Sequence, residues 1–194
     1  MTDPIEQGPI LVTGGARSGK SSFAEQLSAR LADGGTYIAT AQIWDEEMRE
    51  RIGLHRQQRE SSGFAWTTLE EPLELPALLR TCSAKEAHSG VVLVDCLTLW
   101  LSNCLLRVEG QEDAASLTSA AVDELVRAVQ GHEGPLVLVT NEVGSGIVPE
   151  YPLGRLYRDL AGRMNQRLAS VCGQVFLVTA GIPVELKSRA FRLE

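Results

Sequence analysis

The stretch Ile10-Leu11-Val12-Thr13-Gly14-Gly15-Ala16-Arg17-Ser18-Gly19-Lys20-Ser21 decides the fold, because an apolar run opens there into a glycine-rich loop. The part from Gly14 to Ser21 fits the pattern G-x-x-x-x-G-K-[ST] without a mismatch. Glycines allow successive backbone N–H groups to turn inward and surround phosphate oxygens. The stretch therefore predicts a phosphate-binding loop between a strand and a helix.

Two side chains of this loop have chemistry of their own. Lys20 supplies a cation for the β- and γ-phosphates of a nucleotide, and the Ser21 hydroxyl can ligate Mg²⁺. The helix expected over residues 19–32 points its positive end at the anion. A glycine-rich turn that binds nothing is the alternative, and the strand, loop and helix in the required order disfavour it. We therefore expect a nucleotide-binding protein in which Lys20 is catalytic and Ser21 is a metal ligand.

The composition indicates one domain and a small-molecule substrate. The chain has 194 residues, 44% of them apolar, and no linker or low-complexity tract divides it, so we expect a single domain over residues 1–194. Lys and Arg number 18 against 25 Asp and Glu, which gives a formal net charge of −7. That charge opposes nucleic acid as the main partner.

The sequence also bears on location and redox state. The first nine residues lack a basic-then-apolar export signal, and no apolar run approaches the roughly 20 residues of a membrane span, so we expect a cytoplasmic protein. Cys82, Cys96, Cys104 and Cys172 contain no C-x-x-C pair, and the chain has only three histidines. We expect reduced, mostly buried thiols rather than a zinc site or a disulfide framework.

Apolar runs alternate with helical patterns along the rest of the chain. Gly34-Gly35 is interpreted as a helix stop before a strand at 36–40. Further strands are predicted at 63–68, 91–95, 135–140 and 175–179, with an edge strand at 183–187. Helices are predicted at 45–59, from about 73 to 81, and at 97–106, 117–129 and 153–171. This order predicts a three-layer α/β fold of the RecA-like P-loop NTPase kind, with a mostly parallel central sheet and an antiparallel edge strand.

Polar residues follow several of these strands, where ligands bind in parallel sheets. Thr40-Ala41-Gln42 ends the second strand, and we expect it near the nucleotide. Asp95 ends the continuous apolar run 91–94 and is the second metal candidate, since such a carboxylate can hold Mg²⁺ directly or through water. The segment 141–150 is equally compatible with an active-site loop and with an ordinary connection.

Two further features have open interpretations. His55 shares an apolar stripe with Met48 and Ile52, so it is either a histidine that completes this stripe or a nucleophile or acid/base near Arg56 and Arg59. Spacing does not decide between them. The row Arg155, Arg158, Arg163 and Arg167 is either a solvated helix face or a set of nucleotide or subunit contacts.

Taken together, these residues resemble a known family, the bifunctional adenosylcobinamide kinase / adenosylcobinamide-phosphate guanylyltransferases. The resemblance runs from about Ile10 to Lys187. Its most specific segments are Thr140-Asn141-Glu142-Val143-Gly144…Gly146-Ile147-Val148-Pro149 and Arg158-Asp159-Leu160-Ala161-Gly162-Arg163…Asn165-Gln166-Arg167, together with the phosphate loop, Tyr37-Ile38-Ala39-Thr40-Ala41-Gln42, Asp45-Glu46-Glu47-Met48 and Arg51-Ile52…His55-Arg56.

The resemblance implies two reactions with GTP and ATP as substrates and Mg²⁺ as cofactor. A nucleoside triphosphate phosphorylates adenosylcobinamide, and GTP then gives GMP to adenosylcobinamide phosphate through a guanylylated histidine, which matches His55. It also implies nucleotide contacts from the phosphate loop, Thr40-Ala41-Gln42, Arg59, Glu70 and Asp95, and a homotrimer. One departure is that the family's Arg-Pro after the histidine is replaced here by Arg59-Glu60, with a longer step to Trp66.

Two other functions compete with this one. A plain small-molecule P-loop kinase would use the same loop and leave His55 structural. A RecA-like nucleic-acid motor or a regulatory GTPase would act through macromolecular partners, but the acidic balance opposes the motor and the chain lacks an N-K-x-D guanine motif after a strand.

Overall fold

The computed structural model describes residues 8–42, 46, 50, 53, 57, 59, 61–83 and 90–191. Its strands are β1 (Ile10–Gly14), β2 (Gly34–Ala39), β3 (Ala65–Glu70), β4 (Val91–Asp95), β5 (Leu136–Val139), β6 (Gln174–Thr179) and β7 (Ile182–Glu185). Its helices are α1 (Lys20–Leu31), α3 (Leu75–Cys82), α4 (Leu97–Arg107), α5 (Ala114–Gln130) and α6 (Pro152–Val171), with short 3-10 turns η1 (Val143–Ser145) and η2 (Lys187–Arg189). Most of the helix predicted over 45–59, including His55, lies outside the described residues.

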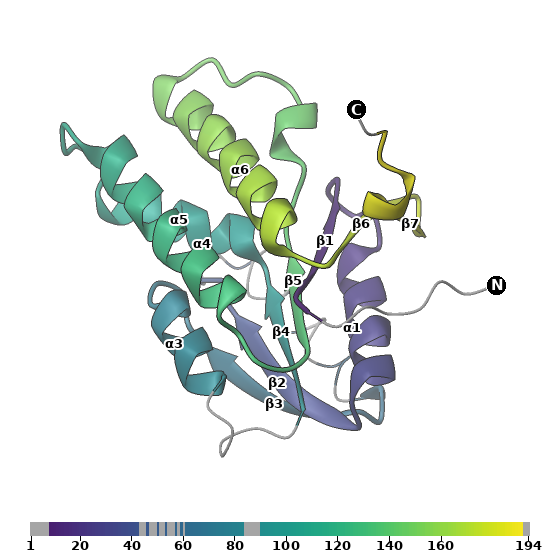
Figure 1. The fold of residues 1–194 in the computed structure, drawn as a ribbon. Coiled ribbons are helices and arrows are strands. Elements are labelled where there is room, and N and C mark those ends of the chain that lie inside the picture. Colours follow the sequence, from purple (N-terminus) through teal and green to yellow (C-terminus); the bar gives the residue numbers. More distant parts are fainter. Residues whose placement is uncertain are drawn as a thin grey trace.

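The strands form one seven-stranded sheet in the order β3-β2-β4-β5-β1-β6-β7 (Figure 1). Neighbouring strands run parallel except β6 and β7, which are antiparallel. The predicted mostly parallel sheet with an antiparallel edge strand is therefore confirmed. Strand β1 lies inside the sheet between β5 and β6, so the loop that follows β1 leaves from a central position.

Alternation of side chains along the buried strands produces the layers. Leu11 packs into one apolar cluster with α3, α4, α5 and α6, whereas Ile10 and Val12 pack into a second cluster with α1. Figure 1 shows the same division, with α3, α4, α5 and α6 on one side of the sheet and α1 on the other. The predicted three-layer architecture is confirmed.

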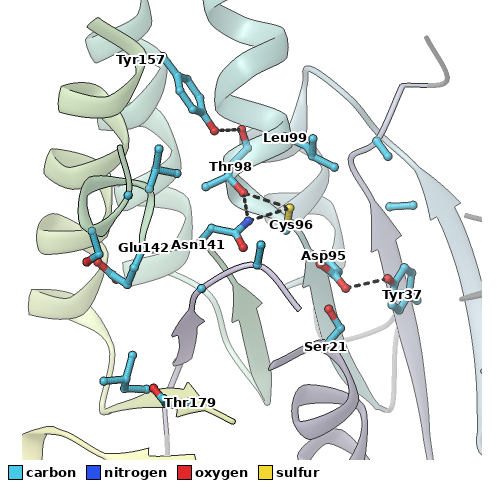
Figure 2. Close-up of a pocket in the computed structure, with 18 of the residues that line it drawn as sticks. Ser21, Tyr37, Asp95, Cys96, Thr98, Leu99, Asn141, Glu142, Tyr157 and Thr179 are labelled. Carbon is cyan, nitrogen blue, oxygen red and sulfur yellow. Dashed lines mark hydrogen bonds between the residues drawn. The ribbon is translucent and has the colours of Figure 1, made fainter. Parts of the chain in front are cut away.

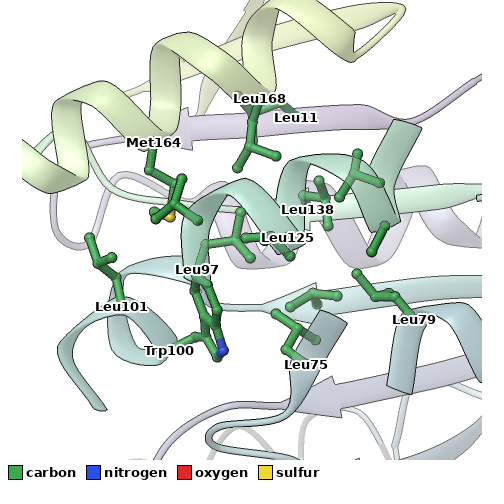
Figure 3. Packing of buried hydrophobic residues seen from close by; sticks show 14 of the residues in the cluster. Leu11, Leu75, Leu79, Leu97, Trp100, Leu101, Leu125, Leu138, Met164 and Leu168 are labelled. Carbon is green, nitrogen blue, oxygen red and sulfur yellow. The ribbon is translucent and has the colours of Figure 1, made fainter. Parts of the chain in front are cut away.

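The larger cluster surrounds Trp100, which is fully buried and donates its indole N–H to the Leu73 carbonyl oxygen at 2.9 Å (Figure 3). This bond satisfies the one polar atom of the side chain. The four cysteines are free and buried, as predicted. Within the described part of the chain, no helix has both the length and the apolar character needed to cross a membrane.

Two sequence-based boundaries were wrong. Gly34 and Gly35 belong to β2 and do not stop a helix before it; a Cβ on Gly35 would lie 2.2 Å from the Val91 carbonyl oxygen, so glycine permits the close approach of β2 and β4. Strand β3 extends beyond the predicted end at 68, because it pairs with β2 as far as Ala39 opposite Glu70. The extension carries Glu70 to the carboxyl edge of the sheet.

The β6–β7 hairpin supports the predicted phosphate loop. Its two turn residues, Ala180 and Gly181, have φ values of 52° and 78°, the left-handed geometry that matches the twist of a hairpin. The Gly181 N–H donates to the Ser18 carbonyl oxygen at 2.9 Å. A Cβ on Gly19 would lie 3.2 Å from the Gly181 Cα, so the turn and the loop are in close contact.

Glu185 fastens the end of β7 and the turn η2 to the start of β6. Its Oε1 accepts the N–H groups of Val175 and Lys187 at 3.0 and 3.1 Å, and its Oε2 accepts the N–H of Ser188 at 2.6 Å. Burial alone would raise the pKa of this carboxyl, but the bonds from Ser188, Val175 and Lys187 outweigh burial and lower the pKa to about 2. Glu185 is therefore ionised and fully engaged at neutral pH.

Candidate active site

A cavity of about 810 Å³ lies at the carboxyl edge of the sheet (Figure 2). Its walls come from the loop after β1, the ends of β2, β3, β4 and β6, the start of α4, the segment after β5, and one side chain of α6. Ligands of parallel α/β sheets bind at this edge, because the loops that follow several strands converge there.

The loop after β1 approaches the cavity with its backbone. Gly15 and Ala16 line the cavity, and a Cβ on Gly14 would lie 2.4 Å from the Val178 carbonyl oxygen. Gly19, the residue before α1, has a φ of 94°, where a side chain would be strained. The glycines that the pattern requires are therefore needed for the turn itself.

Helix α1 begins at this loop with no side-chain cap on its N-terminus. Its first N–H groups and the positive end of its dipole favour an anion. Lys20 is buried, and its Nζ donates to the Gly15 carbonyl oxygen at 2.9 Å, while Ser21 lines the cavity. The Ser18 Oγ is buried with no hydrogen-bond partner among the described residues.

Tyr37, near the end of β2, contacts both a cationic and an acidic side chain. The Arg59 guanidinium lies over the Tyr37 ring, 3.7 Å from the ring centroid, and the Tyr37 hydroxyl donates to Asp95 Oδ2 at 3.1 Å. Burial, and next the Asp95 carboxylate, raise the pKa of Tyr37 well above its usual value, so the phenol stays protonated and can donate. Burial also raises the pKa of Glu25 on α1; the nearby Arg59 opposes this rise and Asp95 adds to it.

Thr40 holds the connections after β2 and β4 together. Its Oγ1 donates to the Cys96 carbonyl oxygen at 2.7 Å and accepts the Cys96 N–H at 3.0 Å. The Asn103 Nδ2 donates to the Thr40 carbonyl oxygen at 2.9 Å. Thr40 is fully buried, so its hydroxyl fixes the backbone beside the cavity.

A second network crosses the cavity wall between α4, β5 and α6. The Asn141 Nδ2 donates to Thr98 Oγ1 at 2.6 Å, and the Tyr157 hydroxyl donates to the Thr98 carbonyl oxygen at 3.0 Å (Figure 2). Burial, and next the charge of Asp95, raise the pKa of the Cys96 thiol, which lies 3.2 Å from Thr98 Oγ1. Cys96 is therefore a protonated wall residue and not a thiolate nucleophile.

Helix α6 fixes the segment after β5. The Glu142 Oε1 accepts the Thr13 hydroxyl at 2.6 Å and the Asn165 Nδ2 at 3.4 Å. Arg158 donates to the Gly144 carbonyl oxygen at 2.6 Å, and Arg155 donates to the carbonyl oxygens of residues 149 and 150. Because residues 141, 142, 143, 145 and 146 line the cavity, this segment is part of its wall. Of the predicted arginine row, Arg158 thus holds this wall segment and Arg155 holds the residues that follow it, while Arg167 pairs with Asp123 on α5.

The structure brings part of the predicted site together around the cavity. The candidates that line it are Gly15, Ala16, Ser21, Ala41, Arg59, Glu70 and Asp95. Those that are not among the lining residues are Gly14, Arg17, Ser18, Gly19, Lys20, Thr40 and Gln42. His55 lies outside the described residues. Sequence reasoning missed Tyr37, Thr98 and Tyr157, of which only Tyr37 carries a signal: it is a polar-tipped aromatic near the end of a buried strand.

Comparison with known proteins identifies the family that this sequence matches. Residues 10–186 match the family described as cobinamide kinase / cobinamide phosphate guanyltransferase. The bifunctional adenosylcobalamin biosynthesis protein CobP of Pseudomonas aeruginosa is 44% identical over 183 residues, which cover 91% of this chain and 96% of that protein. The bifunctional adenosylcobalamin biosynthesis protein CobU of Salmonella typhimurium is 44% identical over 186 residues, covering 92% and 99%.

Among solved structures, the chain is similar to an ATPase from the type III secretion system of pathogenic bacteria. The TM-score is 0.51 at 14% identity, over 89% of this chain and 51% of that one. This likeness concerns the fold alone and agrees with the predicted P-loop NTPase architecture.

Proposed function

Because the chain belongs to the cobinamide kinase / cobinamide phosphate guanyltransferase family, we propose that it catalyses two steps of cobalamin biosynthesis. It phosphorylates adenosylcobinamide with a nucleoside triphosphate, and it then transfers GMP from GTP to adenosylcobinamide phosphate, which yields adenosylcobinamide-GDP. The observation that carries the proposal is a family match over residues 10–186 in a chain whose phosphate loop opens into a large cavity.

The triphosphates, GTP and ATP, would bind along the residues Gly14 to Ser21. The uncapped start of α1 and the unpartnered Ser18 hydroxyl support this assignment, because both provide donors to phosphate oxygens. Lys20 would place positive charge beside the β- and γ-phosphates as the bond to the transferred group breaks. We extend the nucleotide site to Thr40, Ala41 and Gln42, and to Arg59 and Glu70.

Mg²⁺ is the proposed cofactor, held by Ser21 and Asp95. Both side chains line the cavity and offer the hard oxygen ligands that Mg²⁺ prefers. The described residues contain no cluster of three or more acidic, His or Cys side chains suited to a metal. This fits an ion that takes most of its ligands from phosphate and water. When bound, Mg²⁺ would neutralise charge on the phosphates; Ser21 and Asp95 would keep their oxygens directed toward it.

His55 is the proposed nucleophile of the second reaction. An imidazole nitrogen attacks the α-phosphorus of GTP, a P–N bond forms, and the bond to the β-phosphate breaks as pyrophosphate leaves. An oxygen of adenosylcobinamide phosphate then attacks the same phosphorus and the P–N bond breaks. The proposal rests on the family resemblance, because residue 55 lies outside the described part of the chain.

Further parts of the proposal concern the state of the protein. We propose one nucleotide-binding domain over residues 1–194, a homotrimer by family resemblance, and a cytoplasmic location. The net charge of −7 supports a protein that has no nucleic-acid partner.

The test is incubation with α-labelled and with γ-labelled GTP, followed by denaturation and mass spectrometry. We expect GMP bound to His55 and label retained from the α-position only, in an acid-labile, alkali-stable phosphoramidate. His55→Ala should lose GMP transfer and keep kinase activity, since the hydroxyl of adenosylcobinamide attacks the γ-phosphate directly. His132→Ala removes an imidazole outside the cavity and serves as the control.

An adduct on another residue, or full GMP transfer by His55→Ala, would reject His55 as the nucleophile. Kinase activity without any GMP adduct in the wild-type protein would indicate the plain P-loop kinase instead. The two results are independent of each other, because the kinase reaction uses the γ-phosphate of the nucleotide and GMP transfer uses the α-phosphate.

A further inference from the structure

We propose that Tyr37 is a positioning residue that holds the Arg59 guanidinium with the face of its ring and the Asp95 carboxylate with its hydroxyl. The inference rests on the proposed function, in which Arg59 contacts the nucleotide and Asp95 is directed at Mg²⁺. One side chain would then fix both a nucleotide-directed cation and a metal-directed anion at the edge of the cavity.

The contact with Arg59 has the geometry of a cation–π interaction. The guanidinium carbon lies 3.7 Å from the Tyr37 ring centroid, well inside the roughly 6 Å range of such contacts. Arg59 is 6% exposed and Tyr37 is 5% exposed, so water screens their interaction little. Arg59 still lines the cavity, and the stack therefore aims a largely desolvated cation at whatever the cavity binds.

The contact with Asp95 follows from the register of the sheet. Ala39 lies opposite Asp95 in the parallel pair of β2 and β4, and Tyr37 is two residues before Ala39 on the same face of β2. A diagonal neighbour is within reach of a long aromatic side chain. The hydroxyl donates to Oδ2 at 3.1 Å, which leaves Oδ1 of the carboxylate without a bond from Tyr37 (Figure 2).

The Tyr37 ring also contacts a pair of aromatic side chains. The Trp66 ring on β3 meets it edge-on, with centroids 5.9 Å apart and an interplanar angle of 82°. Phe64 packs on Trp66 in turn, with centroids 4.5 Å apart. Because these aromatic contacts restrict the ring, its hydroxyl and its face can each orient a partner.

Two substitutions at one position separate the two contacts. Tyr37→Phe keeps the ring under Arg59 and removes the bond to Asp95, whereas Tyr37→Leu removes both. The probe is a GTP analogue with a non-hydrolysable α–β bridge, which blocks guanylylation of His55, titrated into the full chain by calorimetry, once in EDTA and once over a series of Mg²⁺ concentrations. Binding of Mn²⁺, followed by electron paramagnetic resonance, gives a second readout that needs no turnover.

For Tyr37→Phe we expect unchanged affinity for the analogue in EDTA and a roughly tenfold higher Mg²⁺ concentration at half-maximal binding, as for other residues that orient a metal ligand. For Tyr37→Leu we expect the affinity in EDTA to fall roughly tenfold as well, through loss of the stack. Tyr151→Phe removes the same hydroxyl from an exposed side chain and should change neither value.

An unchanged Mg²⁺ titration for Tyr37→Phe would overturn the link to Asp95, and unchanged affinity of Tyr37→Leu in EDTA would overturn the link to Arg59. If Tyr37→Leu does not fold, Arg59→Lys tests the same stack, because it keeps the charge and loses the planar guanidinium. If the wild-type protein does not bind the analogue, the proposed function fails. If the wild-type protein and both Tyr37 variants bind the analogue with equal affinity and equal Mg²⁺ dependence, only the inference about Tyr37 fails.

Discussion

The phosphate-loop part of the cavity, its contiguous end, is made from one uninterrupted stretch, Gly14 to Ser21. Another part, its dispersed end, is made from Tyr37, Arg59 and Asp95, which come from three separate segments. At the first end we propose that backbone N–H groups and a helix terminus bind the ligand, so the glycines that permit this backbone are visible as a pattern. At the second end the register of β2 against β4 brings the side chains together. Sites built from contiguous backbone can be read from sequence as a pattern, whereas side-chain contacts made by strand register, such as that of Tyr37 with Asp95, cannot.

Replacing the lysine of the contiguous end should have the largest effect. Lys20→Ala removes the cation that we propose lies beside the β- and γ-phosphates. We expect a loss of about 2–4 kcal/mol of transition-state stabilisation, which lowers kcat/KM of the kinase reaction. Steady-state kinetics with adenosylcobinamide measures it. Arg30→Ala, which removes an exposed cation from the far end of α1, should keep wild-type kinetics. Equal rates for Lys20→Ala and wild type would remove the loop from the mechanism.

The next prediction tests whether the contiguous end depends on the β6–β7 hairpin, which lies outside the loop sequence. Glu185→Gln weakens the bonds that fasten the β6–β7 hairpin, on which the loop rests, and should lower the free energy of unfolding by about 1–3 kcal/mol at neutral pH. The folded-state pKa of about 2 lies below the ordinary value of 4.5. The contribution is therefore complete above pH 4.5 and is lost as the pH falls toward 2.

Urea unfolding between pH 7 and pH 2.5 checks this expectation. Wild type should lose more stability than Glu185→Gln over the acid part of this range, so the two curves should converge. Parallel curves would mean that Glu185 does not supply the pH-dependent stability.

The smallest effect is expected at the dispersed end. Asp95→Asn removes the charge that we propose is directed at Mg²⁺ and keeps the size of the side chain, so the Mg²⁺ concentration for half-maximal activity should rise about tenfold with the fold intact. A Mg²⁺ titration of GMP transfer measures this, and Asp33→Asn, on an exposed residue before β2, is the charge-matched control. If the titration curves of Asp95→Asn and wild type coincide, Asp95 has no role in binding Mg²⁺ and is only the last residue of its strand.

Much of the fold could be predicted, because buried parallel strands appear as apolar runs such as 91–94 and 136–139. The errors arose where local signals have two meanings. Gly34-Gly35 has the composition of a helix stop, but the nearness of the Val91 carbonyl oxygen explains Gly35, and that contact is formed by a strand more than fifty residues away.

The candidate site was less accessible to prediction for the same reason. Tyr37 looks like any aromatic residue of a buried strand until β4 lies beside β2 and Arg59 lies on the ring. The arginine row of α6 also gave no sign that Arg158 donates to the Gly144 carbonyl oxygen, between residues that line the cavity. Hydrogen bonds from side chains to a distant backbone leave no pattern in composition or spacing.

The position of β1 has a consequence for the order in which the protein can form during synthesis. Its two neighbours in the sheet, β5 and β6, are Leu136–Val139 and Gln174–Thr179, so both follow it by more than a hundred residues. The complete phosphate-loop sequence is therefore synthesised long before β5 and β6, the strands that flank β1 in the folded sheet. GTP cannot assist the early stages of folding, and protection of the N-terminal third by nucleotide should begin only when residues up to the β6–β7 turn have left the ribosome.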